Sequence, residues 1–183
     1  MKQVIDIPKM LQTSVQLDRS IATEKQLTLN GSARIKNTLL SLDVELSEVA
    51  NTSEWFKVWK EHKGKHDDGK TVRETLLFEY VDAIDFFLVF ASQKQWVENV
   101  DLTNEQFEKL ADKTSKLDLT STYLSVKSML FSSQVSNRPD NFRHAWRLYL
   151  KLGMVGFGFS AAEIEKAYYD KNKINYKRQQ SGY

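Results

Sequence analysis

Two short acidic motifs carry the side chains best suited to chemistry. Glu45-Leu-Ser-Glu48 and Glu79-Tyr-Val-Asp82 each hold two carboxylates three residues apart. In a helix, residues with this spacing project from the same side of adjacent turns. Carboxylate oxygens are hard ligands, and together these groups would suit Mg²⁺ or Mn²⁺ far better than zinc. The motifs therefore point to an all-oxygen metal site.

The residues around both motifs place the carboxylates beside buried surface. Glu45 lies between Leu42 and Val49, at the edge of an apolar stripe with helical spacing. Asp82 falls within a segment that is apolar nearly all round, as buried helices are. Burying an unpaired carboxylate is costly, so such a group must be paired, protonated or bound to a metal.

A structural interpretation of the same carboxylates stays open. Glu45 and Glu48 would then form a solvated helix face, although neither has a lysine or arginine three or four residues away to pair with. Asp82 would form a buried salt bridge, with Arg34 or Arg147 as its partner. The pattern alone does not separate this interpretation from a metal site.

The composition favours long helices as the elements that position these groups. The 183 residues include 7 Gly, 2 Pro and no Cys. Sandwiches, barrels and propellers need frequent Gly- and Pro-rich turns, so these folds are disfavoured. The absence of Cys excludes disulfide scaffolds, thiolate zinc sites and cysteine nucleophiles. A net charge of +2 and the lack of a long apolar run predict neither nucleic-acid nor membrane binding, so we expect a soluble cytoplasmic protein of the all-α class.

Hydrophobic periodicity and capping signals predict seven helices. Thr103-x-x-Gln106 and Ser160-x-x-Glu163 have the form of capping boxes, and Pro139 is a residue favoured in a first helical turn. The first three predicted helices cover about 7–21, the region after 32 toward Glu61, and 72–92, with a polar loop at 63–70 before the third. The other four cover the region from 103, 121–131, 139–153, and the region from 160 through a basic tail.

Further motifs accompany the carboxylates in a specific order. Asn51 and then Phe56-Lys57-x-Trp59 come between the two acidic motifs. Gly158-Phe-Ser-x-x-Glu-Ile-Glu-x-Ala-Tyr168 leads into the run Lys171-Asn-Lys-Ile-Asn175-Tyr-Lys-Arg178-Gln-Gln-Ser-Gly182-Tyr183. Together these motifs, which span most of the chain, resemble the dimeric, all-α dUTPases of the MazG-like nucleoside triphosphate pyrophosphohydrolase superfamily. The acidic motifs alone mark the superfamily, and the C-terminal run makes the dUTPase branch specific.

The resemblance implies a helical bundle with the activity of a dUTP diphosphatase. Such an enzyme hydrolyses dUTP, and also dUDP, to dUMP with release of diphosphate or phosphate. Two or three Mg²⁺ ions, for which Mn²⁺ could substitute, would activate a water for attack on phosphorus. We favour Glu45 as the acceptor of the proton from that water, with Glu48 as the alternative. The metal ligands implied by the resemblance are Glu45, Glu48, Glu79 and Asp82.

The resemblance also assigns residues to the substrate. Lys171, Asn175 and Arg178 have spacings of four and three residues, so one helical face would present all three to phosphate. The alternative for this basic run is a solvated helix end favoured by the helix dipole. Trp59 would stack on the base, or else pack in the core. The full set comprises Lys57, Lys171, Asn175 and Arg178 for phosphate, and Trp59, Asn51, Gln12 and Gln16 for base and sugar.

The resemblance extends to partners and to the organisation of the chain. We expect a homodimer of a phage-type enzyme, located in the cytoplasm of a bacterial host. We expect one domain, 1–183, with 97–134 as an inserted helical subregion. This insert is either a surface elaboration, a part of the dimer contact, or a binding site for a repressor protein. The alternative functions are a pyrophosphohydrolase for dCTP or a damaged deoxynucleotide, and a non-enzymatic helical interaction protein.

Overall fold

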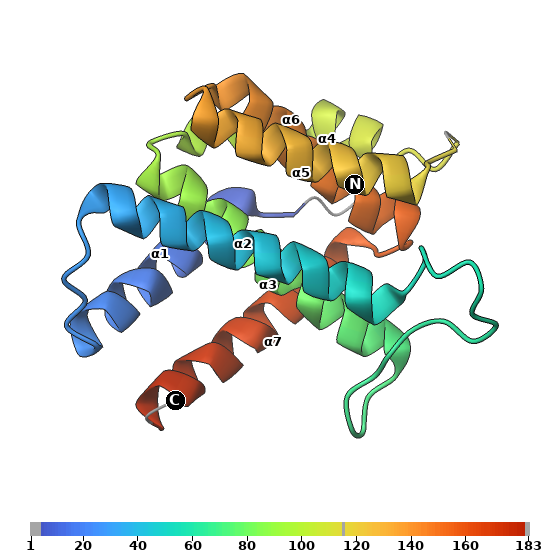
Figure 1. The fold of residues 1–183 in the computed structure, drawn as a ribbon, viewed down its shortest axis with the longest axis horizontal. Helices are drawn as coiled ribbons and strands as arrows, with labels where there is room; N and C mark the ends of the chain where they lie inside the picture. Colours follow the sequence, from blue (N-terminus) through green and yellow to red (C-terminus); the bar gives the residue numbers. More distant parts are fainter. Residues whose placement is uncertain (1–4, 115, 182–183) are drawn as a thin grey trace.

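The computed structural model describes residues 5–114 and 116–181 and contains, within these ranges, seven α-helices and no strand. The all-α class predicted from composition is confirmed (Figure 1). None of the helices in the described part of the chain is long and apolar enough to cross a membrane. The helices are α1 (Ile7–Glu24), α2 (Gly31–Ser53), α3 (Val72–Gln93), α4 (Asn104–Leu110), α5 (Leu119–Val135), α6 (Pro139–Lys151) and α7 (Ala161–Gln180), with a short 3₁₀ turn at Val97–Asn99 and a π-helical segment at Leu152–Gly156.

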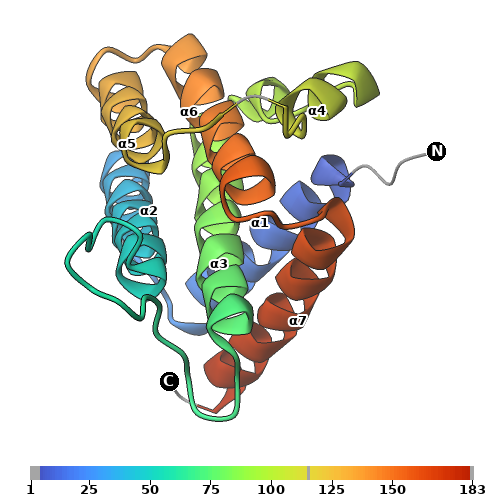
Figure 2. The same ribbon diagram turned by 90° about the vertical axis from the view of Figure 1, so that its right-hand side faces the viewer.

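Helix α3 forms the centre of the molecule. Figure 2 shows it between α2 on one side and α1 and α7 on the other, with α6 above. Its side chains are buried on almost every face, among them Tyr80, Ile84, Phe87 and Phe90, which are fully buried. A helix that is apolar all round must be covered on all sides, so the carboxylates of α3 lie within the helical assembly.

Helix α2 is shorter than the periodicity predicts. It ends at Ser53 instead of continuing toward Glu61, because Glu54 adopts the left-handed conformation with φ of 54° and terminates the helix. Phe56, which the apolar stripe placed on the buried face, lies in the following loop and is 42% exposed. The connection to α3 therefore begins at residue 54 and includes the predicted polar run.

The predicted helix starts agree with the structure. The capping boxes of Thr103 with Gln106 and of Ser160 with Glu163 are both formed, and they begin α4 and α7. Pro139 occupies the first turn of α6. Local hydrogen bonds between a side chain and the first free backbone amides are sufficient to define these starts.

The region 97–134 contains the 3₁₀ turn, α4 and most of α5. Helix α5 packs along α6 and places Val126 and Leu130 in the hydrophobic core, where both are fully buried. The region thus shares the core of the surrounding helices. Gly182 and Tyr183, the end of the C-terminal motif, lie outside the described residues.

Candidate metal and nucleotide site

Three carboxylates from two packed helices converge on one point. Glu45 of α2 and Glu79 and Asp82 of α3 each offer an oxygen atom, and these atoms all lie within 4.8 Å of one another. Glu48, one turn further along α2, is exposed and stands outside this group of three. Because α2 and α3 pack along each other, the two acidic motifs meet although 34 residues separate Glu45 from Glu79.

Burial and mutual repulsion make this cluster hard to ionise. Burial, with added repulsion from Asp82 and Glu79, raises the pKa of Glu45 to about 7. Burial also raises the pKa values of Glu79 and Asp82 above their usual range. Close carboxylates in a partly dry site favour a bound cation over free ionisation. The donor set is made of oxygen alone and fits a hard divalent ion such as Mg²⁺.

Helix α7 supplies positive charge to the same site. The Lys171 ammonium lies 2.6 Å from an Asp82 carboxylate oxygen, and both side chains are only 14% exposed. Asn175 also hydrogen-bonds Asp82, and the positive charge of Arg178 acts on it. The three residues that share one predicted helical face therefore do face the carboxylates. The buried salt bridge of Asp82 is formed with Lys171, not with Arg34, which instead pairs with Asp18 at 2.7 Å.

A cleft of about 300 Å³ opens beside the cluster. Glu45 and Asp82 lie in its wall together with Asn175 and Arg178 from α7. The remaining wall combines apolar side chains with a few polar groups, which is the usual lining of a small-molecule site. These other lining residues are Leu17, Asp18, Ile21, Thr38, Asp85, Phe86, Val89 and Gln179.

Asp85 is part of the wall of this cleft. Its carboxylate accepts hydrogen bonds from the hydroxyls of Ser14 at 2.6 Å and Tyr168 at 3.2 Å, so it joins α3 to α1 and α7. Burial raises the pKa of Asp85 to about 6. Neither hydroxyl was predicted from the sequence. Ser14 is a fully buried polar residue within α1, but which carboxylate it meets depends on how α1 packs against α3.

Several predicted binding residues do not line this cleft. Lys57 donates to Glu54 at 2.8 Å, in the loop after α2. Trp59 is 75% exposed in the same loop and does not pack in the core with Phe56. Asn51 lies near the end of α2, where its amide is 3.5 Å from Glu48. The remaining two, Gln12 and Gln16, are exposed on α1 and are not among the residues that line the cleft.

The fold and the site define a class of protein. Paired acidic motifs on two packed helices, facing a lysine, an asparagine and an arginine on a third, are the arrangement of an all-α nucleotide pyrophosphohydrolase with a divalent metal. Comparison with known families is more specific. Residues 6–183 match the dUTPase family, and the chain belongs to it. No curated protein matches the chain. The protein is accordingly a hydrolase of nucleotide metabolism that acts as a dUTP pyrophosphatase, in a family that uses Mg²⁺.

Proposed function

We propose that the cleft and the carboxylate cluster together form the site of dUTP hydrolysis. The observation that carries this proposal is the convergence of Glu45, Glu79 and Asp82 within 4.8 Å at the wall of the cleft, with Lys171 beside them. The base and sugar enter the part of the cleft lined by apolar side chains. The polyphosphate then extends over the carboxylates.

The cluster would hold two or three Mg²⁺ ions through Glu45, Glu79 and Asp82, with Glu48 as a further ligand at the edge. When bound, these ions supply shielding between the acidic cluster and the phosphates and increase the acidity of water. Glu45 accepts the proton of the attacking water, and Glu48 is the alternative acceptor. Without a cation, burial and the acidic neighbours of Glu45 raise its pKa to about 7. A bound cation lowers this pKa, so the carboxylate is then ionised and able to accept a proton.

The phosphates are bound by Lys171, Asn175 and Arg178, with Lys57 from the loop. This role is supported by the position of the three α7 residues, which contact or act on Asp82 at the metal site. An arginine can bind phosphate oxygens through two parallel hydrogen bonds. Contacts of Trp59, Asn51, Gln12 and Gln16 with the base and sugar remain predictions.

The test is an assay of diphosphate release from each deoxynucleoside triphosphate with Mg²⁺. We expect dUTP to be the preferred substrate. In Glu79→Gln, which loses one charge of the cluster with little change of shape, turnover should fall by at least about 100-fold while the thermal midpoint is retained. Preference for dCTP would contradict the assignment of the base. Full activity in Glu79→Gln would contradict the assignment of the metal site.

We also propose that two copies of the chain form a homodimer through α2 and α5. Leu40 and Val44 are 62% and 50% exposed on one side of α2, and Leu124 is 59% exposed on α5. The two helices are joined by an ion pair of 2.7 Å between Lys127 and Asp43. Large exposed apolar side chains on neighbouring helices are typical of a protein interface.

We further propose that the protein is a phage-type enzyme located in a bacterial cytoplasm. The same proposal includes a single domain with an insert at 97–134.

A groove of about 1010 Å³ lies between α4 and the segment 154–162, with Phe107 and Phe159 in its wall. It is our proposed site for a repressor protein. If Phe107→Ala leaves repressor affinity unchanged, this part of the proposal is wrong.

A further inference from the structure

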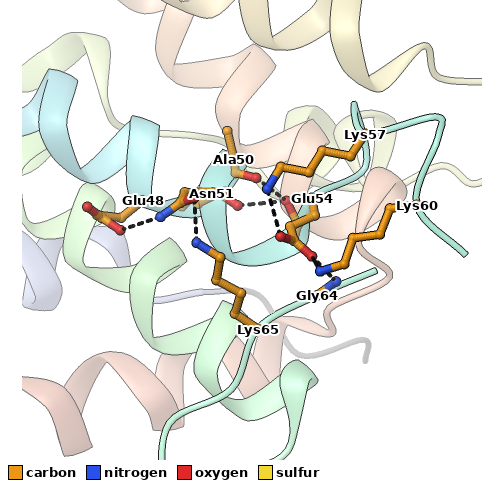
Figure 3. A network of polar contacts seen from close by, with 10 residues as sticks. Glu48, Ala50, Asn51, Glu54, Lys57, Lys60, Gly64 and Lys65 are labelled. Carbon is orange, nitrogen blue, oxygen red and sulfur yellow. Dashed lines mark hydrogen bonds and ion pairs between the residues drawn. The ribbon is translucent and has the colours of Figure 1, made fainter. Parts of the chain in front are cut away.

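Glu54 organises the loop between α2 and α3. Although charged, it is only 1% exposed, and it accepts hydrogen bonds from Lys57 at 2.8 Å, from Lys60, and from the backbone amide of Gly64 at 3.0 Å (Figure 3). These donors hold the pKa of Glu54 down to about 2, so it is ionised at neutral pH. One buried carboxylate thus connects the start of the loop to its return segment.

The return segment of the loop is fixed against the end of α2. The Lys65 amide donates to the Thr52 carbonyl at 2.8 Å, next to the bond between Gly64 and Glu54. Gly64 has φ of +99°, and a Cβ atom there would collide with Val72 at the start of α3. Glycine is the residue that adopts this conformation readily and fits in so little space. The turn at Gly64 and the bond from the Lys65 amide to Thr52 together fix the backbone position of Lys65.

This geometry places the Lys65 ammonium next to Asn51, which lies beside Glu48 at the edge of the carboxylate cluster. Its Nζ atom donates to the Asn51 side-chain oxygen at 2.7 Å, and the Asn51 amide is 3.5 Å from Glu48 (Figure 3). The charge of Glu48 in turn acts on both Glu45 and Glu79. The loop is therefore connected to the carboxylate cluster through Asn51 and then Glu48.

The charge of Lys65 is not neutralised by a neighbouring carboxylate. Lys57 and Lys60 both form ion pairs with Glu54, whereas none of the ion pairs between described residues includes Lys65. An ammonium has three donors, and one of them goes to the neutral amide of Asn51. Such a group is suited to bind an anion.

We propose that Lys65 binds the terminal phosphates of the nucleoside triphosphate, and that Glu54 is the positioning residue that places it there. This inference rests on the proposed function. Along α2, Thr38 and Glu45 line the cleft, and Asn51 follows about 9 Å beyond Glu45 at 1.5 Å per residue. The base, the carboxylate cluster and Lys65 are therefore arranged in that order, so the far end of a triphosphate is the part that reaches Lys65. This order places Asn51 at the phosphate end of the site, away from the base and sugar to which the sequence assigned it.

The experiment compares two ligands with Mg²⁺ present, the non-hydrolysable analogue α,β-imido-dUTP and the product dUMP, by calorimetry. In Lys65→Met we expect affinity for the analogue to fall about tenfold, the value of one charge-assisted hydrogen bond. Affinity for dUMP should change by less than about twofold because the monophosphate does not extend to Lys65. Lys63→Met is the matched control, since this exposed lysine of the same loop donates to the Trp55 carbonyl and should bind both ligands like the wild type.

Glu54→Gln tests the positioning role. It removes the charge that holds the loop, so it should produce the same selective loss for the analogue. In the double variant with Lys65→Met, the two losses should not add, because Glu54 acts through Lys65. Losses that add would show that Glu54 acts through Lys57, which it also binds, and would overturn the positioning role. A merely structural role would instead lower the affinities for the analogue and for dUMP in parallel.

Failure of the inference about Lys65 can be distinguished from failure of the proposed function. If the wild type hydrolyses dUTP and Lys65→Met binds the analogue unchanged, the inference about Lys65 is wrong and the proposed function stands. If the wild type neither hydrolyses dUTP nor binds the analogue, the proposed function fails and this inference fails with it.

Discussion

Asp85 is a titratable group whose state depends on the packing of three helices. Its pKa rises from the usual 3.8 to about 6, chiefly through burial. The folded state therefore binds this proton more tightly than the unfolded state, so raising the pH from about 4 to about 6 destabilises the fold. Above pH 6 the destabilisation from this group is complete.

We predict that Asp85→Asn removes this part of the pH dependence. An asparagine oxygen can accept the same hydrogen bonds from Ser14 and Tyr168 without carrying charge. Thermal unfolding in EDTA should show similar midpoints for the two proteins at pH 4, and a midpoint higher by about 3–6 °C in the variant at pH 7. Equal midpoints for the two proteins across this range would show that Asp85 does not titrate as described.

For single residues, the sequence predicted the chemical role of the carboxylates better than it predicted which side chains lie next to one another. The spacing of Glu45, Glu79 and Asp82 was sufficient to propose a metal site, because their neighbours have helical periodicity. Glu54 and Lys65 were not predicted. Their partners are set by one left-handed residue and by a glycine in a loop, and neither feature has a periodic signal.

Helix boundaries were predictable where a local signal defines them. Thr103 and Ser160 carry complete capping boxes, so the starts of α4 and α7 follow from four residues each. The end of α2 was not predictable from the apolar stripe, because Phe56 continued the spacing after the helix had ended at Ser53. Glu54 ends the helix in the left-handed conformation, and its ion pairs with Lys57 and Lys60 stabilise the loop that follows.

The π-helical segment at Leu152–Gly156 depends on a close approach between two elements. A Cβ atom on Gly153 would overlap the ring of Tyr80 in α3. That ring cannot shift easily, because its hydroxyl donates to the Tyr149 carbonyl at 3.2 Å and it stacks on the Tyr149 ring at 4.7 Å. We predict that Gly153→Ala destabilises the protein by about 1–3 kcal/mol, as overpacking does.

The free energy of unfolding of Gly153→Ala can be measured by chemical denaturation. Gly31→Ala is the control, because a Cβ atom there meets nothing within 4 Å at the exposed start of α2. It should leave the free energy of unfolding unchanged or raise it by up to about 1 kcal/mol. If Gly153→Ala is as stable as this control, the contact with Tyr80 is looser than described.

At the scale of the whole molecule, near-neutrality conceals separated charges. The net charge of +2 is a sum over the whole chain, within which a carboxylate cluster lies on α2 and α3 and cationic groups lie on α7 and in the loop after α2. The composition predicted the helical class, but it could not predict which helices meet. Which helices pack together depends on α3, because this helix is apolar all round and α1, α2 and α7 pack against it.

The exposed apolar side chains of α2 and α5 predict the oligomeric state of the protein. If they form the dimer contact, the wild type should sediment at twice the 21.2 kDa of one chain at micromolar concentration. Val44→Lys with Leu124→Lys places like charges in the contact from both copies and should give monomers, since the same surface is repeated across a two-fold axis. Val58→Lys is the control, because Val58 is 82% exposed in the loop after α2, and this variant should remain dimeric. A monomeric wild type, or a double variant that stays dimeric, would show that α2 and α5 do not form the interface.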